Sequence, residues 1–496
     1  TYTARNWLAT STDTDGNTTE YLEFDGAGNV LRERDALGRE TVYEYNDLGR
    51  LISITRAANT ADAAEETFAY DAVGNVTDQT DPLGRVTHTE YDNRGRVKTR
   101  TVAYQTADAG TEEYVYDCAG NVIRHRGPRV LADGSTYETA FTYDHLDRLT
   151  SVTEAYGRPG AATRRMWYDA DGNVVKETDP RYETLGPAYK TERVFDALGR
   201  VTRLTDAQGL TTGYEYDRYG NPTRVTDAWN NTTGYEYDGL DRLTKTTDPW
   251  GKETSTVYSL GGSLAVRTDP LGKTTTRVYD GEGRLVREID HDGFSIAYTF
   301  TAAGLAEYVT DKQGVVTWTE YDNLDRVHFV HCAFGAPEGY TEEYRYQKVG
   351  NITDFVNGRG IVTRLEYDNR DRLVTKTYAY GLPEQTAEHR VYDAVGNLLQ
   401  FTDGDQLTTY VYDDRGNQIR INRAVGTAAE TTEAYAYDVA GNLTDQWAPS
   451  YKDDPAGRHT HFTYDRISRL LASTIFTDTV EAGELTVTVE YRDAPN

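Results

Sequence analysis

The sequence predicts an all-β fold in which antiparallel two-strand repeats join into one long, spiralling, solenoid-like sheet. Three observations predict it: a basic repeat of 21 residues along the whole chain, two turn motifs in each repeat, and segments rich in Thr, Val and Tyr between the turns. Turn signals at short, regular intervals with β-prone residues between them are typical of all-β proteins. We therefore expect one array of about 21 repeats over residues 1–496, incomplete at both ends.

Each repeat is marked by an aromatic residue that is usually followed by Asp. The 21 marker positions are Phe24, Tyr45, Tyr70, Tyr91, Tyr116, Tyr143, Tyr168, Phe195, Tyr216, Tyr237, Tyr258, Tyr279, Phe300, Tyr321, Tyr346, Tyr367, Tyr392, Tyr412, Tyr437, Tyr464 and Tyr491. All spacings but one that depart from 21 are longer by four or six residues. Side chains alternate between the faces of a strand, so an even insertion keeps each on its face. We expect two added residues in each arm of a long hairpin, with loops such as residues 57–66.

The repeat that starts at Phe195 shows the two turns. Asp196 to Gly199 and Asp206 to Gly209 both have the pattern D-x-x-G, and Asp217 with Gly220 begins the next repeat. Asp at the first turn position accepts backbone N–H bonds, and Gly at the fourth tolerates a positive φ. The segments between these turns, residues 200–205 and 210–216, are predicted to be strands.

Tyr is the predicted packing residue of the sheet. Tyr214 and Tyr216 share one face of their strand, and most repeats have an aromatic residue two positions before the marker. Cross-strand aromatic neighbours stabilise sheets. The ladder is expected to include Tyr45, Tyr70, Tyr91, Tyr116, Tyr216, Tyr237 and Tyr279.

A second pattern follows the marker. The fourth position after it is mostly Gly, but it is Asp147, Asp241, Asp325, Asp371 and Ser468 in five repeats. The fifth position is Arg in every second repeat up to Arg372. Alternate turns therefore meet a different surface, such as a neighbouring coil or a partner, or the chain descends from a duplicated two-repeat ancestor; we favour duplication.

Composition excludes several classes of protein. The net charge of -28 argues against a nucleic-acid partner, because phosphate binding needs concentrated Lys and Arg. No apolar run is long enough to form a transmembrane helix. Cys118 and Cys332 are too few for a disulfide framework, and their redox state is left open. The start at Thr1, without Met or a signal-like segment, is typical of a processed or excised product.

No catalytic, cofactor-binding or metal site is predicted. His328 and His331 flank Cys332, but we expect a solvated loop there. The Asp that follows most markers is expected to cap a turn and not to bind calcium. Trp229 and Trp250 occupy the same place in successive second turns, so they form a possible binding surface, for instance for sugars; packing against an adjacent coil is the alternative.

The predicted ribbon must curl. About 42 strands at ~4.8 Å each would span ~200 Å, whereas twisted open sheets rarely exceed ~10 strands. Two solutions fit: a continuous spiral whose turns stack edge to edge, or four-stranded propeller blades. We favour the spiral, because nothing in the sequence marks breaks between sheets.

At these residues the chain resembles the YD-repeat, or Rhs-repeat, family, with its pattern G-R-L-T-x-x-x-D-P-x-G-x-x-T-x-Y-x-Y-D. Gly199, Arg200, Val201 and Thr202 match it, followed by Asp206, Gly209, Thr212, Tyr214, Tyr216 and Asp217. The resemblance implies a spiral sheet that, in bacterial Rhs proteins and toxin-complex C components, forms a hollow shell around a C-terminal toxin. Teneurin-like relatives use such sheets as extracellular scaffolds. The nearest strings to the family's D-P-x-G-L cleavage segment, residues 81–85 and 269–273, lack its final Leu and are interpreted as ordinary turns.

The resemblance therefore implies a non-enzymatic structural protein, secreted or on the cell surface of a bacterium. We expect it to form part of the wall of a shell that encloses a toxin or another polypeptide cargo. Its expected partners are that cargo or the rest of a larger chain, with self-assembly possible. The alternative is an extracellular fibre or an adhesion or carbohydrate-binding scaffold, and a processed carbohydrate-active enzyme is a distant third.

Overall fold

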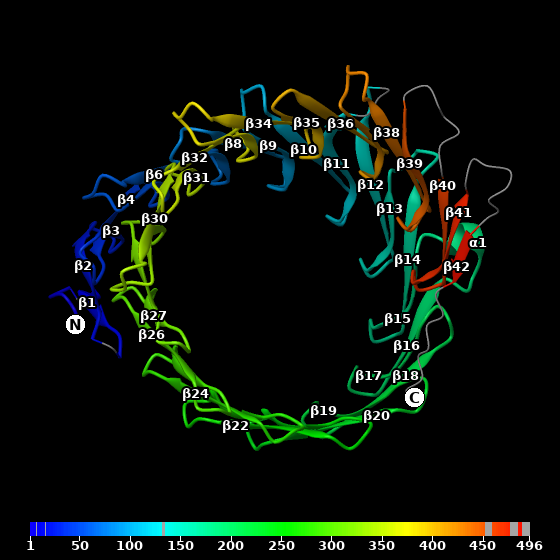
Figure 1. Ribbon diagram of the computed structural model, residues 1–496, viewed down its shortest axis with the longest axis horizontal. Coiled ribbons are helices and arrows are strands. Elements are labelled where there is room, and N and C mark those ends of the chain that lie inside the picture. Colours follow the sequence, from blue (N-terminus) through cyan, green and yellow to red (C-terminus); the bar gives the residue numbers. More distant parts are fainter. Residues whose placement is uncertain (6, 15, 131–133, 452–458, 477–484, 489–496) are drawn as a thin grey trace. The chain divides into compact units, whose positions relative to one another are not determined.

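The chain is seen in a computed structural model that describes residues 1–496 except 6, 15, 131–133, 452–458, 477–484 and 489–496 (Figure 1). The marker Tyr491 lies outside the described residues. These contain 42 strands and one short helix, α1 (Tyr182–Leu185), which the sequence did not predict. The strands fall into two compact units, unit 1 (residues 1–109 and 254–387) and unit 2 (residues 110–253 and 388–496).

Each unit contains two runs, where a run is a series of consecutive strands that pair antiparallel, each with the next. The first run of unit 1 comprises β1 (Thr10–Thr12), β2 (Thr18–Phe24), β3 (Val30–Arg34), β4 (Glu40–Tyr45), β5 (Leu51–Arg56), β6 (Ala64–Tyr70), β7 (Val76–Thr80), β8 (Val86–Tyr91) and β9 (Val97–Val102). Its second run comprises β22 (Glu253–Tyr258), β23 (Leu264–Thr268), β24 (Thr274–Tyr279), β25 (Leu285–Ile289), β26 (Ser295–Phe300), β27 (Ala306–Thr310), β28 (Val316–Tyr321), β29 (Val327–Cys332), β30 (Tyr340–Tyr346), β31 (Ile352–Val356), β32 (Val362–Tyr367) and β33 (Leu373–Tyr378).

Unit 2 is built in the same way. Its first run comprises β10 (Gly110–Tyr116), β11 (Val122–Val130), β12 (Thr136–Tyr143), β13 (Leu149–Glu154), β14 (Ala162–Tyr168), β15 (Val174–Thr178), β16 (Lys190–Phe195), β17 (Val201–Thr205), β18 (Thr211–Tyr216), β19 (Pro222–Thr226), β20 (Thr232–Tyr237) and β21 (Leu243–Thr247). Its second run comprises β34 (Thr386–Tyr392), β35 (Leu398–Asp403), β36 (Gln406–Tyr412), β37 (Gln418–Arg423), β38 (Thr431–Tyr437), β39 (Leu443–Tyr451), β40 (His459–Tyr464), β41 (Leu470–Phe476) and β42 (Leu485–Thr488). The predicted all-β, antiparallel, two-strand repeat is confirmed.

The turns form as the sequence predicts. In the first turn, which follows the marker, Asp196 Oδ1 accepts the backbone N–H groups of Leu198 and Arg200 at 2.9 and 3.0 Å. Gly199 closes the turn with φ +74°, and in the second turn Gly209 has φ +87°. The Asp and Ser residues that replace Gly also lie in the left-handed region, with φ from 58° to 66°. Their short polar side chains tolerate that conformation.

A bulge beside each first turn explains why the marker is usually Tyr. Between Glu215↔Arg224 and Tyr216↔Pro222 the register shifts, so β19 carries one extra residue. The Tyr216 hydroxyl donates to the carbonyl of Val201, the first residue of β17, at 2.8 Å, and Tyr237 bonds Pro222 in the same way at 3.0 Å. Burial raises the pKa of both hydroxyls above its ordinary value, which keeps them as donors. Each marker Tyr of this kind ties the end of its repeat to the start.

Removing one of these hydroxyls should cost stability. Tyr216→Phe keeps the packing but leaves the Val201 carbonyl without this donor, so we expect about 1 kcal/mol less stability in urea unfolding. Phe195→Tyr, at the equivalent place one repeat earlier, is the matched control and should leave stability unchanged or raise it. Equal midpoints for wild type and Tyr216→Phe would contradict this role of the hydroxyl.

The Arg of alternate first turns links one repeat to the next. Arg200 Nε donates to Asp196 Oδ2 at 2.7 Å, and its Nη1 reaches the carbonyl of Asp217 at 2.9 Å. Its guanidinium also lies over the Tyr216 ring, 4.8 Å from the centroid. The same arrangement recurs at Arg148 and Arg326. Arg thus fastens a repeat to its successor within the ribbon.

The long repeats differ from the expected loop of residues 57–66. One residue pair, Arg56↔Ala64, is added to the ladder, and the remaining insertion widens the turn to residues 57–63. The prediction of two added residues in each arm is therefore wrong. Ala57 turns the chain with φ 50° and is 4% exposed. Ala stands at this position in six long repeats, as Ala57, Ala103, Ala155, Ala333, Ala379 and Ala424, all with φ of 48–51°.

The sheet is a thin wall with little enclosed core. Among the described residues, the buried apolar side chains are Ile421 and seven alanines. The larger side chains, including the Tyr ladder, are mostly half-buried. Stability therefore depends on backbone ladders, Tyr hydroxyls and polar links between repeats more than on a packed interior.

Candidate functional site

The two runs of each unit meet edge to edge, and we call this line of contact the seam. The first run contributes its second turns and wide loops, and the second run contributes first turns. In unit 1, the turn between β3 and β4 and the loop between β5 and β6 both contact the turn between β28 and β29, although 261 to 286 residues separate the bonded residues in the sequence. The prediction that successive coils of the spiral stack edge to edge is confirmed within each unit.

In the seam of unit 1, Arg39 lies at the end of the turn between β3 and β4. Its Nε donates to Asp35 Oδ2 at 2.6 Å, while Nη1 contacts the carboxylate of Asp325 and the carbonyl of Asn323 in the second run. Beside it, Asn323 Nδ2 donates to Asp62 Oδ2 of the first run at 2.7 Å. One first turn of the second run is thus held between a second turn and a wide loop.

The same set of contacts recurs 46 residues further along both runs. Arg85 donates bidentately to Asp371, with Nη1 to Oδ1 at 2.8 Å and Nη2 to Oδ2 at 2.9 Å. Asn369 Nδ2 donates to Asp108 Oδ2 at 2.8 Å. The sequence separations, 286 residues for the Arg–Asp pairs and 261 for the Asn–Asp pairs, are identical at both places. The seam therefore keeps a fixed register.

Burial and charge at these contacts favour the paired state. The Arg85 side chain is 12% exposed. Burial lowers its pKa, but the hydrogen bonds to Asp371 and Asp81 outweigh this and hold the pKa above its ordinary value. Planar, bidentate Arg–carboxylate pairs are the stronger kind of ion pair. Asp371 takes the left-handed position, φ 60°, that Gly fills in most repeats, so the Asp substitution supplies the seam carboxylate.

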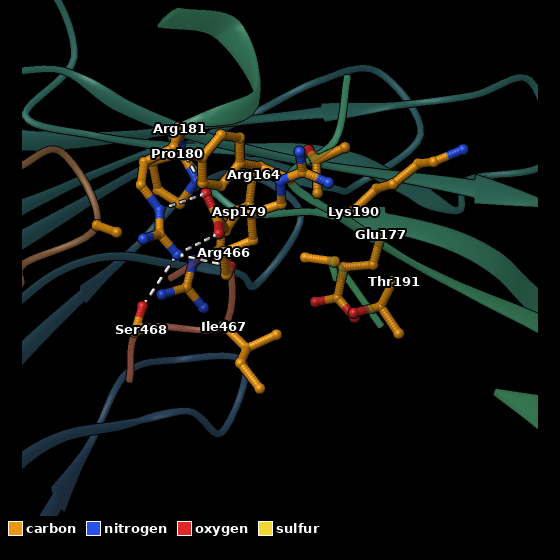
Figure 2. Close-up of a pocket in the computed structure, with 14 residues that line it drawn as sticks. Arg164, Glu177, Asp179, Pro180, Arg181, Lys190, Thr191, Arg466, Ile467 and Ser468 are labelled. Atoms are coloured by element: carbon orange, nitrogen blue, oxygen red, sulfur yellow. Dashed lines mark hydrogen bonds and ion pairs between the residues drawn. The ribbon is translucent and has the colours of Figure 1, made fainter. Parts of the chain in front are cut away.

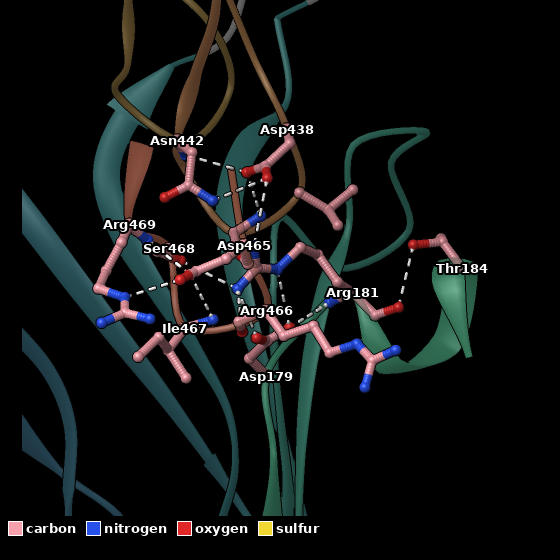
Figure 3. A network of polar contacts seen from close by, with 12 residues as sticks. Asp179, Arg181, Thr184, Asp438, Asn442, Asp465, Arg466, Ile467, Ser468 and Arg469 are labelled. Atoms are coloured by element: carbon pink, nitrogen blue, oxygen red, sulfur yellow. Dashed lines mark hydrogen bonds and ion pairs between the residues drawn. The ribbon is translucent and has the colours of Figure 1, made fainter. Parts of the chain in front are cut away.

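In unit 2, Arg181 makes the corresponding link (Figure 3). It follows β15 directly before α1 and is 3% exposed. Its Nη2 donates to Asp179 Oδ2 at 2.8 Å, to the Arg466 carbonyl at 3.1 Å and to Ser468 Oγ at 2.9 Å. The guanidinium also reaches the Asp465 carbonyl and lies over the Tyr189 ring. One buried guanidinium thus donates to two backbone carbonyls and one hydroxyl of a single first turn in the second run.

A pocket of about 380 Å³ lies beside this link (Figure 2). Its walls come from the first run, including Arg164, Glu177 and Lys190, and from Arg466 to Ser468 of the second run. Further along, Arg469 Nη2 donates to Gln208 Oε1 at 3.0 Å. In both units, a first turn of the second run therefore contacts two successive connections of the first run.

Alternate first turns contact the seam. The turns of residues 322–326, 368–372 and 465–469 all carry Arg at their end and all meet the neighbouring run. For the second runs, this supports the alternative hypothesis that alternate turns meet a neighbouring coil.

We expect the turn carboxylates to make the array resistant to acid. Hydrogen bonds from Arg96 and Arg148 lower the pKa of Asp92 and Asp144 from 3.8 to about 2. Since these pKa values are lower in the folded state than in the unfolded chain, their stabilisation is complete above pH 3.8 and is lost as the pH falls towards 2. We expect the far-UV circular dichroism to change within that window.

A matched substitution tests this explanation. Asn46 caps its turn as Asp does, accepting the Leu48 N–H at 3.0 Å. Asp144→Asn should therefore keep the turn but remove one titrating group and its ion pair with Arg148. Unfolding of the wild type at or above pH 4 would show that the turn carboxylates are not the groups responsible.

The predicted site residues lie as follows. The markers Tyr45, Tyr70, Tyr91, Tyr116, Tyr216, Tyr237 and Tyr279 each end a strand and are half-buried. Asp196, Gly199, Asp206, Gly209, Asp217 and Gly220 form first and second turns. Trp229 and Trp250 occupy second turns of unit 2 and are 42% and 66% exposed. The structure does not bring these residues together into one site.

The segment around His328 and His331 is not the expected solvated loop but strand β29. Because the two histidines are three residues apart on this strand, their side chains project from opposite faces. His331 stacks on Trp318 at 4.4 Å and contacts Glu320 at 2.6 Å. Cys118 and Cys332 are both thiols. No helix in the described part of the chain is long and apolar enough to cross a membrane.

Sequence reasoning missed the seam residues Arg39, Arg85 and Arg181. It also missed Arg129, whose guanidinium donates to the carbonyls of Asp413 and Asp414 in the second run of unit 2. A signal was present: D-A-L-G-R ending at Arg39 and D-P-L-G-R ending at Arg85 lie 46 residues apart, as do Asn323 and Asn369. What the sequence does not show is how many repeats the ribbon needs before it returns alongside itself.

Comparisons with known proteins agree with this architecture. Residues 68–258 and 307–480 match the Teneurin YD-shell family, and residues 24–61 match the RHS repeat. A search of curated proteins finds no match.

Among solved structures, the chain is similar to TcdB2-TccC3 without its hypervariable C-terminal region, with a TM-score of 0.64 and 15% identity over 95% of this chain and 30% of that one. A second TcdB2-TccC3 structure gives 0.60 and 14%, covering 96% and 35%. The Tc holotoxin pore of Photorhabdus luminescens gives 0.54 and 16%, covering 95% and 29%. The chain thus spans about a third or less of each of these structures, and at this identity they show a shared fold. Because the family match covers well over half of its residues, the chain belongs to the Teneurin YD-shell family.

Proposed function

We propose that residues 1–496 act as one repeat array that forms part of the wall of a shell enclosing a toxin or another polypeptide. The role is confinement and involves no catalysis. The observation that carries this proposal is the seam, because ion pairs in fixed register turn a ribbon into a continuous wall two runs wide. The Arg residues of the seam bond to other residues of the same chain, so the wall needs no partner molecule to hold its two runs together.

The comparisons support the same role. The similar solved structures contain TccC3, and one of them is described as lacking a hypervariable C-terminal region. A shared shell fold combined with a variable C-terminal segment is consistent with a shell that encloses different cargoes. The acidic surface, with a net charge of -28, would limit adhesion to anionic membranes and nucleic acids outside the shell. We place the protein outside a bacterial cell or on its surface.

An extracellular scaffold that binds carbohydrate is the second candidate. Trp229 and Trp250 favour it, because they expose aromatic rings 21 residues apart in successive second turns of one run. In this role the outer surface would act and no cargo would be enclosed. Loss of glycan-array binding in Trp250→Ala would favour the scaffold over the shell.

Protease protection tests confinement. The protein is purified from its own source with any polypeptide that accompanies it, and is treated with a protease too large to cross the wall. We expect the accompanying polypeptide to survive, and to be digested when the seam is opened by Arg181→Met. Digestion at the same rate with intact and opened seams, or purification with no cargo at all, would contradict the proposal.

A further inference from the structure

A cluster of three metal-ligand side chains lies across the hairpin of β39 and β40 in unit 2. Asp445 Oδ1 lies 2.7 Å from His459 Nε2 and 2.8 Å from His461 Nδ1. All three ligand atoms lie within 4.8 Å of one another. No metal site was predicted from the sequence, in which 13 residues separate Asp445 from His459.

The register of the hairpin brings the cluster together. His459 and His461 are two residues apart on β40, so they project from the same face. Asp445 on β39 lies directly opposite His461, and Trp447 lies opposite His459. The Trp447 ring stacks on His459 with centroids 5.0 Å apart and an interplanar angle of 7°. This stacking limits rotation of the imidazole and keeps Nε2 directed at Asp445.

A second hairpin shows what the third ligand adds. In unit 1, His88 Nδ1 lies 2.7 Å from Asp78 Oδ1, at the same repeat positions as His461 and Asp445. There the residue two positions before His88 is Val86, so the pair has no second imidazole. An Asp–His pair is therefore an ordinary cross-strand contact of this ribbon, and His459 is what distinguishes β40.

We propose that Asp445, His459 and His461 bind a divalent transition-metal ion, with Zn²⁺ as the preferred ion, and that the ion clips this hairpin together. Two imidazoles and one carboxylate are a common Zn²⁺ ligand set, and a water molecule completes the tetrahedron. Tetrahedral ligands at ~2.0–2.1 Å from Zn²⁺ lie roughly 3.3 Å apart, so the Asp445 oxygen, now 2.7 and 2.8 Å from the two histidine nitrogens, needs to separate from each by only about 0.5 Å.

The electrostatics also suit a cation. Burial raises the pKa of Asp445, but hydrogen bonds from the two histidines outweigh this and lower it, so its carboxylate is charged at neutral pH. The side chains of Asp445, His459 and His461 are 21%, 27% and 43% exposed, which leaves the cluster open to an ion from solution.

Calorimetric titration of the purified chain with ZnCl₂ tests the proposal. We expect one site in the wild type. His459→Gln and His461→Gln should each weaken it by more than the roughly 10–100-fold that losing an outer-shell partner costs. His88→Gln is the matched control and should leave Zn²⁺ affinity unchanged. Binding that is absent in the wild type, or equal in all four proteins, would overturn the proposal.

A spectroscopic readout on the unaltered protein guards against variants that fail to fold. Bound Co²⁺ should give the intense visible absorption of a four-coordinate site, and one equivalent of Zn²⁺ should abolish it. Mg²⁺ should not compete, because it prefers oxygen ligands in an octahedron. A weak spectrum typical of hydrated Co²⁺ would show that no such site forms, leaving Asp445 as a hydrogen-bond acceptor only.

Discussion

Arg181→Met is expected to open the seam of unit 2 at a cost of about 3–5 kcal/mol, the range for removing one partner from a buried ion pair. The substitution keeps an unbranched, apolar stem but removes every hydrogen bond of the guanidinium. Asp179 then keeps its charge without its main partner, and the Arg466 carbonyl and Ser468 hydroxyl lose a donor. Few other positions in the described chain combine such burial with contacts to both runs.

Hydrogen exchange followed by mass spectrometry can locate this loss. Amides of residues 465–469 should exchange faster in Arg181→Met, whereas amides in the interior of β18 and β20 should not change. Arg164→Met is the matched control, because Arg164 lines the same pocket but is exposed. We expect the control to stay within about 0.5 kcal/mol of the wild type. Equal exchange at residues 465–469 in both variants would mean that Arg181 does not hold the runs together.

Ala155→Val is expected to destabilise its hairpin by about 3 kcal/mol, because strain and overpacking add. Ala155 is 1% exposed and has φ 49°, a conformation that β-branched residues rarely adopt. It also positions Tyr156, whose N–H donates to the Glu138 carbonyl at 2.9 Å. Urea unfolding monitored by tyrosine fluorescence should show the lower midpoint.

Two controls separate the causes. Ala155→Gly relieves the left-handed backbone strain but loses one buried methyl group. These two effects on the free energy of unfolding nearly cancel, so it should change by no more than about 1 kcal/mol. Ala170→Val, in the exposed turn after β14, adds the same methyl groups without burial and should have little effect. A mild result for Ala155→Val would mean that the wide turn adapts and that its Ala is not required.

Local structure was predictable because each repeat carries its own turn chemistry. D-x-x-G fixes both ends of a strand, as at Asp196 and Gly199, and the period of two assigns Tyr214 and Tyr216 to one face. The function of the Tyr hydroxyl was not predictable, because its acceptor, such as the Val201 carbonyl, is displayed by a bulge. The wide turn was not predictable either, because Ala rarely adopts the left-handed conformation that Ala57 has, and its presence in the sequence therefore does not indicate a turn.

The sequence predicts that the ribbon curls, but not which repeats come to lie side by side. The length of the ribbon required it to curl, but the pairing of Arg85 with Asp371 depends on where the ribbon returns alongside itself. Twist and bulges accumulated over many strands set that point, and no single repeat specifies it. The cluster around Asp445 was missed for a related reason, since His459 and His461 meet it only across a hairpin whose loop length varies between repeats.

Electron cryo-microscopy of the purified protein most directly tests the claim that the seam builds a shell wall. We expect a closed, hollow particle with an internal space of tens of ångströms, in which Arg39–Asp325 and Arg181–Ser468 contacts join neighbouring runs. A solid rod or an indefinitely growing filament, or runs joined in another register, would contradict it.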